Sequence, residues 1–494
     1  MADETIDRTK SPVFLGRYKI LIDDVEINES NVVDILHKCL QIHNSNAWEE
    51  DYLYNYRKGL QPILSREKTV RPEINNRLVE NHSSEITSFK VSYLLNAPVS
   101  YTASQTAVDI NDDLIRLNKW MKYEKKKTKD FDLETWAHTC GVGVRMVLPD
   151  AMADLEQDEC PFELYSLDPR RAFVAYGNSL GEPRRMGVKY IIKEDGSTIY
   201  SVYTATDYYE ICFENYGTPI MLHEINPLGK IPLVEYTINQ ERMGCFEKVL
   251  PLLDAINLTS SDRVNGIQQF IQSLLLFHNV KLDEEATKDL KDLGGIQFDD
   301  NENMPASISY LNAELNQTET QVLVTWMYQV VLYICGMPNR NGGSSTSDTG
   351  AATIVRDGWY DAEGKAQEAE ERFDDAEMDF LDVALYISNV MSGTKLNPMD
   401  IDIKLPRKNY ENIQQKAQVL TTLLANDKIA PRRAYIASGM FTDSEEAYAE
   451  GMEYYKKVKE EAQKEALAVA KTQKADPSKD GSEDPEKKPE DTSA

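Results

Sequence analysis

The sequence lacks the patterns of histidine and cysteine that usually mark a catalytic or metal centre. Its six cysteines are scattered along 494 residues without a C-x-x-C pair, and none of its six histidines stands at metal-ligand spacing. We therefore expect buried, reduced thiols, no metal, no cofactor and no histidine-based triad. The acidic run DDNEN at 299–303 also lacks the central glycine and distal glutamate of a calcium loop. These absences predict a chain that is not an enzyme.

Long apolar runs are absent as well. The first residues, MADETIDRTKSP, contain no apolar core of the signal-peptide kind, so we expect the chain to stay in the cytosol where it is made. In the most apolar stretch, 317–336, Gln321, Thr325 and Gln329 interrupt the run, which falls short of the roughly 20 residues that a bilayer requires. We expect no membrane span there. A helix that is apolar on most faces instead indicates packing against neighbours, from its own chain or from other subunits.

Basic residues are in short supply. The chain has 54 Lys and Arg against 82 Asp and Glu, a formal net charge of −28. Tight DNA binding is disfavoured, because neutralising phosphates with cations supplies most of the affinity of such complexes. The only dense basic run, Lys122 to Asp130, is predicted to be a solvated turn between two helices. This composition leaves room only for weak or transient contact with DNA.

What the sequence does contain is a predominantly helical pattern with one strand-rich segment. Apolar residues at three- and four-residue spacing predict helices at 31–58 and 73–95, followed by two more at 107–122 and 131–140. Between 161 and 238, short runs rich in Val, Ile, Tyr and Phe predict a small antiparallel sheet or sandwich. The Asp195-Gly196 step predicts a hairpin in which both turn residues take positive φ. The predicted fold class is α+β, predominantly α.

Three long helices are predicted in the second half of the chain. The first runs from about 246 to 278 with Pro251 in its first turns, and the second runs from about 317 to 335, ended by Gly336 and Pro338. The third predicted helix starts near Thr349, capped by that residue or Asp348, and continues to 391. Around these helices the sequence predicts a compact module with a short helix and two strands at 280–316, a strand at 399–405, a helical region at 409–473 and a disordered tail.

The stretch CGMPNRNGGSSTSDTGAATIVRDGWY, 335–360, is rich enough in glycine and serine to suggest a phosphate cradle. A phosphate-binding loop of the Walker type needs a lysine and follows a strand. Here the segment GGSSTSDTG contains no lysine and follows a helix. A nucleotide-binding enzyme that uses residues 341–350 is therefore a disfavoured alternative.

Three further segments carry a family resemblance. Residues 75–101 combine a helix with a Y-L-x-x-x-P-x-x-Y turn, and CGVGVRMVLPD at 140–150 predicts a short strand. Residues 226–270 contain G-K-I-P-L-V-E-Y, an Asn-Gln turn and L-L-D-A-I-N-x-x-x-S-D. In this order they resemble the portal proteins of tailed double-stranded DNA bacteriophages, in particular the family found in many long-tailed phages of Gram-positive hosts. The resemblance covers roughly residues 30 to 440.

The resemblance implies the phage portal fold, a ring normally of twelve copies at one five-fold vertex of the capsid. Such a ring is a conduit for double-stranded DNA during packaging and ejection. The implied partners are other copies of the chain, the DNA, the terminase large subunit, a head-tail adaptor, and the major capsid and scaffold proteins, with no membrane. The protein would belong to the virion, and to the host cytoplasm during assembly. A non-portal oligomeric structural or scaffold protein is the alternative.

The resemblance also divides the chain and implies two functional sites. The segment after the second long helix would be a tunnel loop lining the channel, and among its implied channel residues Arg340 is the only one able to pair with phosphate. The tip of the helix pair would be a clip that docks the motor and the adaptor, although its acidic residues are also explained as simple solvation of a short helix. The implied divisions are an N-terminal arm 1–30, wing 31–245, first stem helix 246–278, clip 279–316, second stem helix 317–336, tunnel loop 337–349, spine helix and wing strand 350–408, crown 409–470 and acidic tail 471–494. The implied channel residues are Arg340, Asn341, Ser344, Ser345, Thr346 and Ser347, and the implied docking residues are Lys281, Asp283, Glu284, Glu285, Lys288, Asp299 and Asp300.

Overall fold

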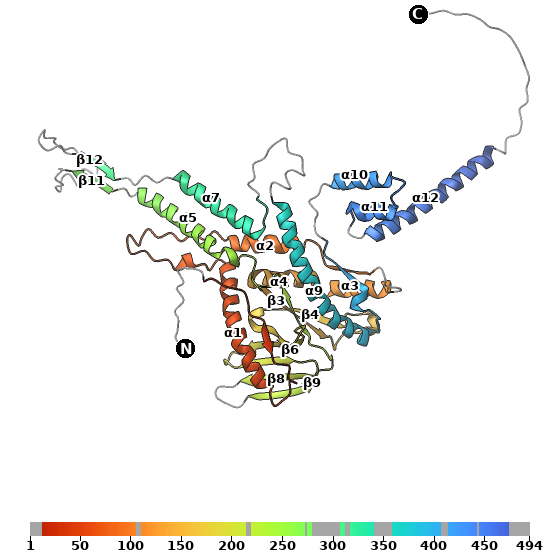
Figure 1. Cartoon of the computed structure of the whole chain (residues 1–494), viewed down its shortest axis with the longest axis horizontal. Coiled ribbons are helices and arrows are strands. Elements are labelled where there is room, and N and C mark those ends of the chain that lie inside the picture. The colour runs from red at the N-terminus through yellow and green to blue at the C-terminus, as the bar shows by residue number, and fades with distance from the viewer. Residues whose placement is uncertain are drawn as a thin grey trace, which may run out of the picture. The chain divides into compact units, whose positions relative to one another are not determined.

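The structure is a computed structural model in which two units are distinguished, residues 1–408 and 409–494 (Figure 1). The first unit mixes helices with sheets, and the second is helical, so the expected combination of α and β structure is confirmed. The described residues are 12–104, 110–213, 219–271, 274–278, 307–311, 317–339, 358–406, 413–441 and 444–473.

The larger sheet has six strands and is covered on one face by α1 (Val32–Arg57). Leu36 and Cys39 of α1 pack against strand residues such as Met186, because the apolar positions of the helix recur on one side. Neighbouring strands are antiparallel except for the first, which runs parallel to its neighbour and lies in a stretch where no strand was expected. The order is β1 (Ile20–Ile22), β5 (Ala172–Gly177), β6 (Arg184–Ile192), β7 (Thr198–Tyr203), β8 (Asp207–Phe213) and β9 (Ile220–Ile225).

The β6–β7 hairpin lies where the Asp-Gly step predicts it, but its turn is of another type. Gly196 has a φ of +84°, whereas Asp195 is not among the described residues with positive φ. The Gly196 N–H donates to the carbonyl of Lys193 at 3.0 Å, and the Lys193 N–H donates to Ser197 at 2.8 Å. This is a loop with a type I turn followed by a left-handed glycine. The prediction of two positive φ values was wrong.

A second sheet lies between the first sheet and a layer of helices. Its central strand β3 (Val142–Pro149) is flanked by β4 (Phe162–Leu167) and β10 (Leu233–Thr237). One face packs on the six-stranded sheet through Val144 and Met146. The other face carries α4 (Lys126–Cys140) and the long α9 (Trp359–Ser392). Because β3 is covered on both sides, its sequence is nearly continuously apolar.

Two smaller elements close the helical side of this core. Helix α3 (Asn111–Tyr123) contributes Trp120, which packs against Phe162 with 6.4 Å between ring centroids. Strand β2 (Ser100–Ala103) pairs with β13 (Ile401–Lys404), so the strand expected at 399–405 is confirmed.

Helix α2 (His82–Leu94) begins nine residues later than the predicted start at 73. Asn81 caps it by accepting a hydrogen bond from the Ser84 N–H at 3.3 Å. The preceding residues are not helical because their backbone is held by polar side chains of α5 (Leu250–Ile271) at a spacing of four residues. Asn257 accepts from Glu80, Ser261 accepts from Leu78 and Asn265 accepts from Asn76, at distances of 2.7, 2.9 and 2.7 Å.

The predicted pair of long helices is present as α5 and α7 (Gln317–Cys335), side by side in Figure 1. Pro251 is the second residue of α5, as expected. The helix does not reach 278, because residues 274–278 form strand β11 (Leu274–His278), which pairs with β12 (Ser307–Leu311). At the end of α7, Gly336 has a φ of +60°, and the N–H groups of Gly336 and Met337 donate to Tyr333 and Leu332. This is the Schellman arrangement, which satisfies the last carbonyls of the helix.

Helix α9 begins at Trp359 with Gly358 at its N-cap, ten residues after the predicted start, and it ends at Ser392, as expected. Residues 349–357 lie outside the described part of the chain. The second unit contains the expected helices, α10 (Ile413–Leu424), α11 (Pro431–Ser438) and α12 (Ser444–Gln473). The six cysteines are free thiols, four of them buried.

Candidate functional site

Both sets of predicted site residues lie outside the described part of the chain. The channel residues are Arg340, Asn341, Ser344, Ser345, Thr346 and Ser347, and the docking residues are Lys281, Asp283, Glu284, Glu285, Lys288, Asp299 and Asp300. Their roles therefore stay predictions. The structure does describe the elements from which both segments leave and to which they return.

The helix pair α5–α7 flanks the first segment, and α7 leads from it to the second. Its inner side is apolar: Leu253 and Ile256 of α5 belong to one buried cluster with Met327 and Val331 of α7. The pair is also tied to α2, because the Tyr328 hydroxyl donates to the Glu85 carboxylate at 3.0 Å. Apolar positions at three- and four-residue spacing explain why the two helices pack along their length.

The opposite side of α7 is apolar and exposed, and we call it the α7 outer face. It consists of Val322, Leu323, Trp326, Tyr333 and Ile334, which are 64%, 47%, 57%, 80% and 44% exposed. Residues 322, 326 and 333 are four and seven positions apart and so lie on one side of the helix. The expectation that this helix needs neighbours is met by its own chain on one side only. Among the described residues, nothing covers the other side.

The ends of each undescribed segment are held side by side. Residues 279–306 are flanked by His278 of β11 and Ser307 of β12, which pair with each other. At residues 340–357, Gly358 lies so close to Met337 that a Cβ on it would stand 3.8 Å from the Met337 carbonyl oxygen. Trp359 further contacts the rings of Phe89 and Tyr93 on α2, each at 6.2 Å between centroids. Both segments thus leave and re-enter at fixed bases.

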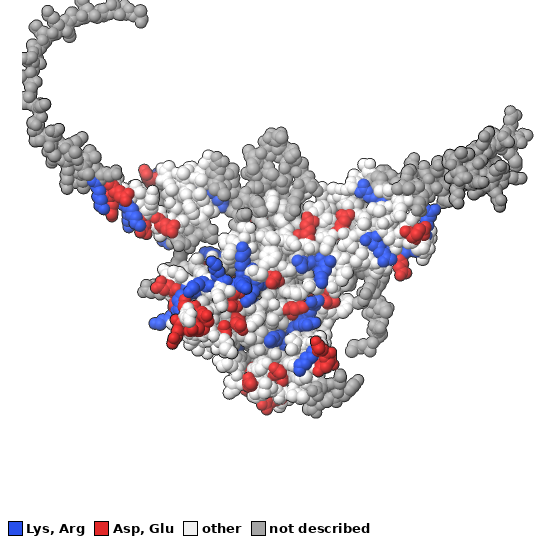
Figure 2. Space-filling view, turned by 180° about the vertical axis from the view of Figure 1, so that it is seen from behind, with Lys and Arg blue, Asp and Glu red and all other residues white. Residues whose placement is uncertain are grey.

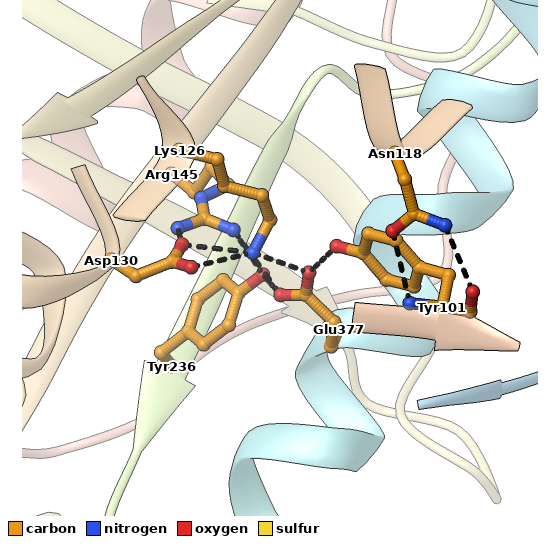
Figure 3. Close-up of polar contacts among 7 residues, drawn as sticks. All are labelled: Tyr101, Asn118, Lys126, Asp130, Arg145, Tyr236 and Glu377. Atoms are coloured by element: carbon orange, nitrogen blue, oxygen red, sulfur yellow. Dashed lines mark hydrogen bonds and ion pairs between the residues drawn. The ribbon is translucent and has the colours of Figure 1, made fainter. Parts of the chain in front are cut away.

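A buried ionic cluster lies where α4, α9 and the second sheet meet (Figure 3). The Lys126 ammonium lies 2.8 Å from both Asp130 and Glu377, and the Arg145 guanidinium lies 3.1 Å from Glu377 and also pairs with Asp130. Two cations and two carboxylates balance one another. We call these four residues the ionic cluster.

Two tyrosines complete the hydrogen bonding of Glu377. The hydroxyls of Tyr101 and Tyr236 donate to its carboxylate at 2.5 and 2.7 Å. Burial raises the pKa of Glu377, but Lys126 and Arg145 outweigh that effect and lower the pKa below its usual value. Burial also raises the pKa values of both tyrosines well above normal, so they stay protonated donors. Asn118 holds the backbone of Tyr101 from α3, accepting at 3.2 Å and donating at 2.9 Å.

Sequence reasoning missed this cluster. The prediction that the basic run 122–130 is a solvated turn is wrong for Lys126, which is only 3% exposed. Lys122, Lys125 and Lys127 are exposed, as expected. One available signal was Arg145, a cation in the middle of the apolar strand VGVRMVLP, because buried arginine requires a paired anion. The arrangement of the ionic cluster points to a structural role, because its four charges neutralise one another.

The surface of the described residues carries charges of both signs. Figure 2 shows basic side chains interspersed with acidic ones over one face of the molecule. Within the described ranges, no group of three or more His, Cys, Asp and Glu could hold a metal ion. A search of the same residues for membrane-spanning helices finds none of sufficient length and apolarity.

The sequence matches the family described as "Phage portal protein, SPP1 Gp6-like" over residues 36–465. Since the match spans most of the chain, the protein belongs to the phage portal proteins, and among them to the SPP1 Gp6-like family. The resemblance seen in the sequence motifs is confirmed. Membership assigns a portal-type structural role as a component of the virion at the capsid vertex, and it argues against the alternative of a non-portal scaffold protein.

Two other comparisons are less informative. A solved structure described as "Neck of empty GTA particle computed with C6 symmetry" is similar with a TM-score of 0.41 and 10% sequence identity, over 73% of this chain and 90% of that chain. Comparison with curated proteins gives no match.

Proposed function

We propose that this portal-family chain assembles into a closed ring of about twelve copies, in which each subunit repeats the same contact with the next. The α7 outer face supports this proposal most directly. Five large apolar side chains, 44% to 80% exposed, follow one another along a single helix. Monomeric soluble proteins rarely leave such a continuous apolar surface in water. Contact with the helix pair of a neighbouring copy would bury it.

The ring would surround a channel that conducts double-stranded DNA during genome packaging and ejection. In this arrangement α5 and α7 form the stem, residues 279–316 the clip, 337–349 the tunnel loop and 409–470 the crown. The body formed by the two sheets, α1, α4 and α9 is the wing. The formal charge of −28 suits a passive or gating conduit, because an acidic lining repels the phosphate backbone and lets it slide.

The tunnel loop is proposed to meet the DNA. Arg340 would make transient charge-assisted contacts with phosphates, while Asn341, Ser344, Ser345, Thr346 and Ser347 keep that surface polar and small. The adjacent ends of the segment at Met337 and Gly358 support this role, because a projecting loop needs a common base.

The clip is proposed to dock the terminase large subunit during packaging and the head-tail adaptor afterwards. The proposed docking residues are Lys281, Asp283, Glu284, Glu285, Lys288, Asp299 and Asp300. The pairing of β11 with β12 supports the proposal, since it fixes both ends of the segment at the tip of the helix pair. Major capsid and scaffold proteins are the proposed partners of the wing and crown at the vertex.

Particle imaging of the purified full-length chain tests the ring. We expect class averages of a closed ring with a central hole wide enough for duplex DNA. Particles without a central channel would contradict the proposal.

Two variants then separate the sites. Deletion of residues 341–347 is expected to leave rings intact and to reduce packaging of full-length genomes. Normal packaging by this variant would make the segment a mere linker.

Replacement of Asp283, Glu284 and Glu285 by asparagine and glutamine is expected to leave rings intact and to weaken adaptor docking. Unchanged docking would favour simple solvation of the clip.

A further inference from the structure

A cavity of about 200 Å³ lies at the base of the segment 340–357. It is bounded by α2, by His138 of α4, by residues 238–248, by the end of α7 and by the first turns of α9. Three lysines line it, each from a different element: Lys90 from α2, Lys248 from the 3-10 helix 247–249 that precedes α5, and Lys365 from α9. Two acidic residues also line it, Glu241 and Glu368. The lining thus has one cation in excess, in a chain with a strong overall negative charge.

Lys90 is the unusual member of this lining. Among the described residues, its ammonium has no hydrogen bond or ion pair, whereas Lys365 pairs with Glu368 at 2.8 Å. One nearby carboxylate, that of Glu363, accepts from the Tyr93 hydroxyl at 2.7 Å. The Schellman bonds at the end of α7 satisfy the carbonyls of Leu332 and Tyr333. Burial lowers the pKa of Lys90, as expected where an ammonium has lost water without gaining a carboxylate.

A partly buried cation without a partner is costly, and an anion in the adjoining cavity would remove that cost. One water molecule needs only about 10–15 Å³ of such space, so this cavity has room for an anion of several atoms. Three ammonium groups, each with three donors, match an oxyanion that presents acceptors in several directions.

We propose that this cavity binds a phosphate-type oxyanion, held by Lys90 together with Lys248 and Lys365. The bound anion would join α2, the entrance to α5 and the start of α9. It would therefore fix the base at Met337 and Gly358, from which the segment 340–357 leaves and to which it returns. The site requires only residues of one chain and does not depend on ring formation.

Calorimetric titration of the full-length chain with inorganic phosphate tests the proposal, against chloride at equal ionic strength. We expect phosphate to bind and to raise the melting temperature more than chloride does. Lys90→Met is expected to weaken phosphate binding roughly tenfold to a hundredfold, the range of one charge-assisted hydrogen bond. Without phosphate, this variant should melt no lower than the wild type, because it removes an unpaired cation.

Two further variants make the result specific. Lys248→Met changes an exposed side chain of the same cavity and should also weaken phosphate binding. This variant tests the site independently if Lys90→Met fails to fold. Lys122→Met removes an equal charge from an exposed position on α3 and should bind phosphate as the wild type does. A phosphate response no larger than that of chloride, or equal in all three variants, would overturn the site.

A competition arm identifies the source of the phosphate group. A short DNA duplex could displace inorganic phosphate from the wild type but not from Lys122→Met. Displacement would then depend on an exposed charge outside the cavity, and the assignment of the phosphate group to DNA would be overturned. If the duplex displaces phosphate equally from the wild type and Lys122→Met, the DNA backbone supplies the group. If it displaces none, the site takes the free anion. Particle imaging of the same samples reports ring formation separately, so loss of the ring and loss of this site are distinguishable.

Discussion

The wing and the helix pair place their charged and apolar side chains in opposite ways. The wing has four charges in its interior, in an ionic cluster whose members are at most 3% exposed. The helix pair has large apolar side chains at its surface, with Tyr333 of the α7 outer face 80% exposed. The wing thus satisfies its most demanding groups within one chain. Among the described residues, the helix pair leaves the α7 outer face uncovered, and in the proposed ring another copy would cover it.

Glu377→Gln should show the largest effect on the wing. The substitution leaves Lys126 and Arg145 with one carboxylate between them, so we expect the free energy of unfolding to fall by about 3–5 kcal/mol. Urea denaturation followed by circular dichroism measures this change. Glu371→Gln removes the same charge from an exposed position on the same helix and should change stability by less than about 0.5 kcal/mol. Equal losses in both variants would show that the cluster contributes nothing specific.

Trp326→Glu should have the next largest effect, on assembly rather than on folding. An aromatic side chain at the centre of an interface often contributes about 2–4 kcal/mol, and a buried carboxylate would add a penalty. We expect light scattering to show loss of the ring while the melting profile of the wing is kept. The matched control is Leu180→Glu, because Leu180 is fully exposed in the loop between β5 and β6. Rings that persist in Trp326→Glu would place the subunit contact elsewhere.

Glu50→Gln tests an exception to the rule that the wing satisfies its buried charged groups. This carboxyl group is 3% exposed, and its Oε2 atom has no hydrogen-bond partner among the described residues. Burial raises the pKa of Glu50 to about 8, against the opposing effects of Arg17 and Arg242. The folded chain keeps this proton up to about pH 8, whereas an unfolded chain releases it near 4.5. The contribution of Glu50 to stability therefore declines as the pH rises between these values.

Glutamine at this position stays neutral at every pH. We expect Glu50→Gln to stabilise the fold by roughly 1–3 kcal/mol at about pH 9 and to have little effect at about pH 5. Melting curves across this range measure the difference. A pH-independent effect would show that Glu50 does not titrate in this window.

Lys230→Gln should have the smallest effect. Lys230 pairs with Asp382 of α9 at 2.5 Å, but the side chains are 30% and 47% exposed. Water and salt screen such a pair, so we expect a loss below about 1 kcal/mol that shrinks further at high salt. Urea denaturation at low and high salt measures it. A loss as large as that of Glu377→Gln would contradict the distinction between buried and exposed pairs on this helix.

Local signals in the sequence predict much of the fold. The sequence Cys335-Gly336-Met337-Pro338 correctly predicts the end of α7, because a left-handed glycine and a following proline stop a helix wherever they occur. Leu274 to His278 was predicted as helix and is strand β11. Its partner β12 begins 29 residues after it ends, and a leucine-rich segment takes the strand conformation only through such a distant pairing.

The candidate sites are harder to predict from the sequence. Lys126 and Lys122 stand in the same basic run, yet only Lys126 is buried, because its acceptor Glu377 arrives from a helix far along the chain. Lys90 gives no local signal either, since its cavity is assembled from five separate parts of the sequence. The roles of the tunnel loop and the clip were inferred from the family resemblance rather than from spacing, and they stay proposals.

The ionic cluster can be completed only late in the synthesis of the chain. Arg145 and Glu377 are 232 residues apart in the chain. At a synthesis rate of about 5–20 residues per second, roughly 10 to 50 seconds pass between the two. During that interval the core of the wing carries more positive than negative charge at this point. The wing therefore reaches electrical balance only after α5, α7 and the segment between them have been made.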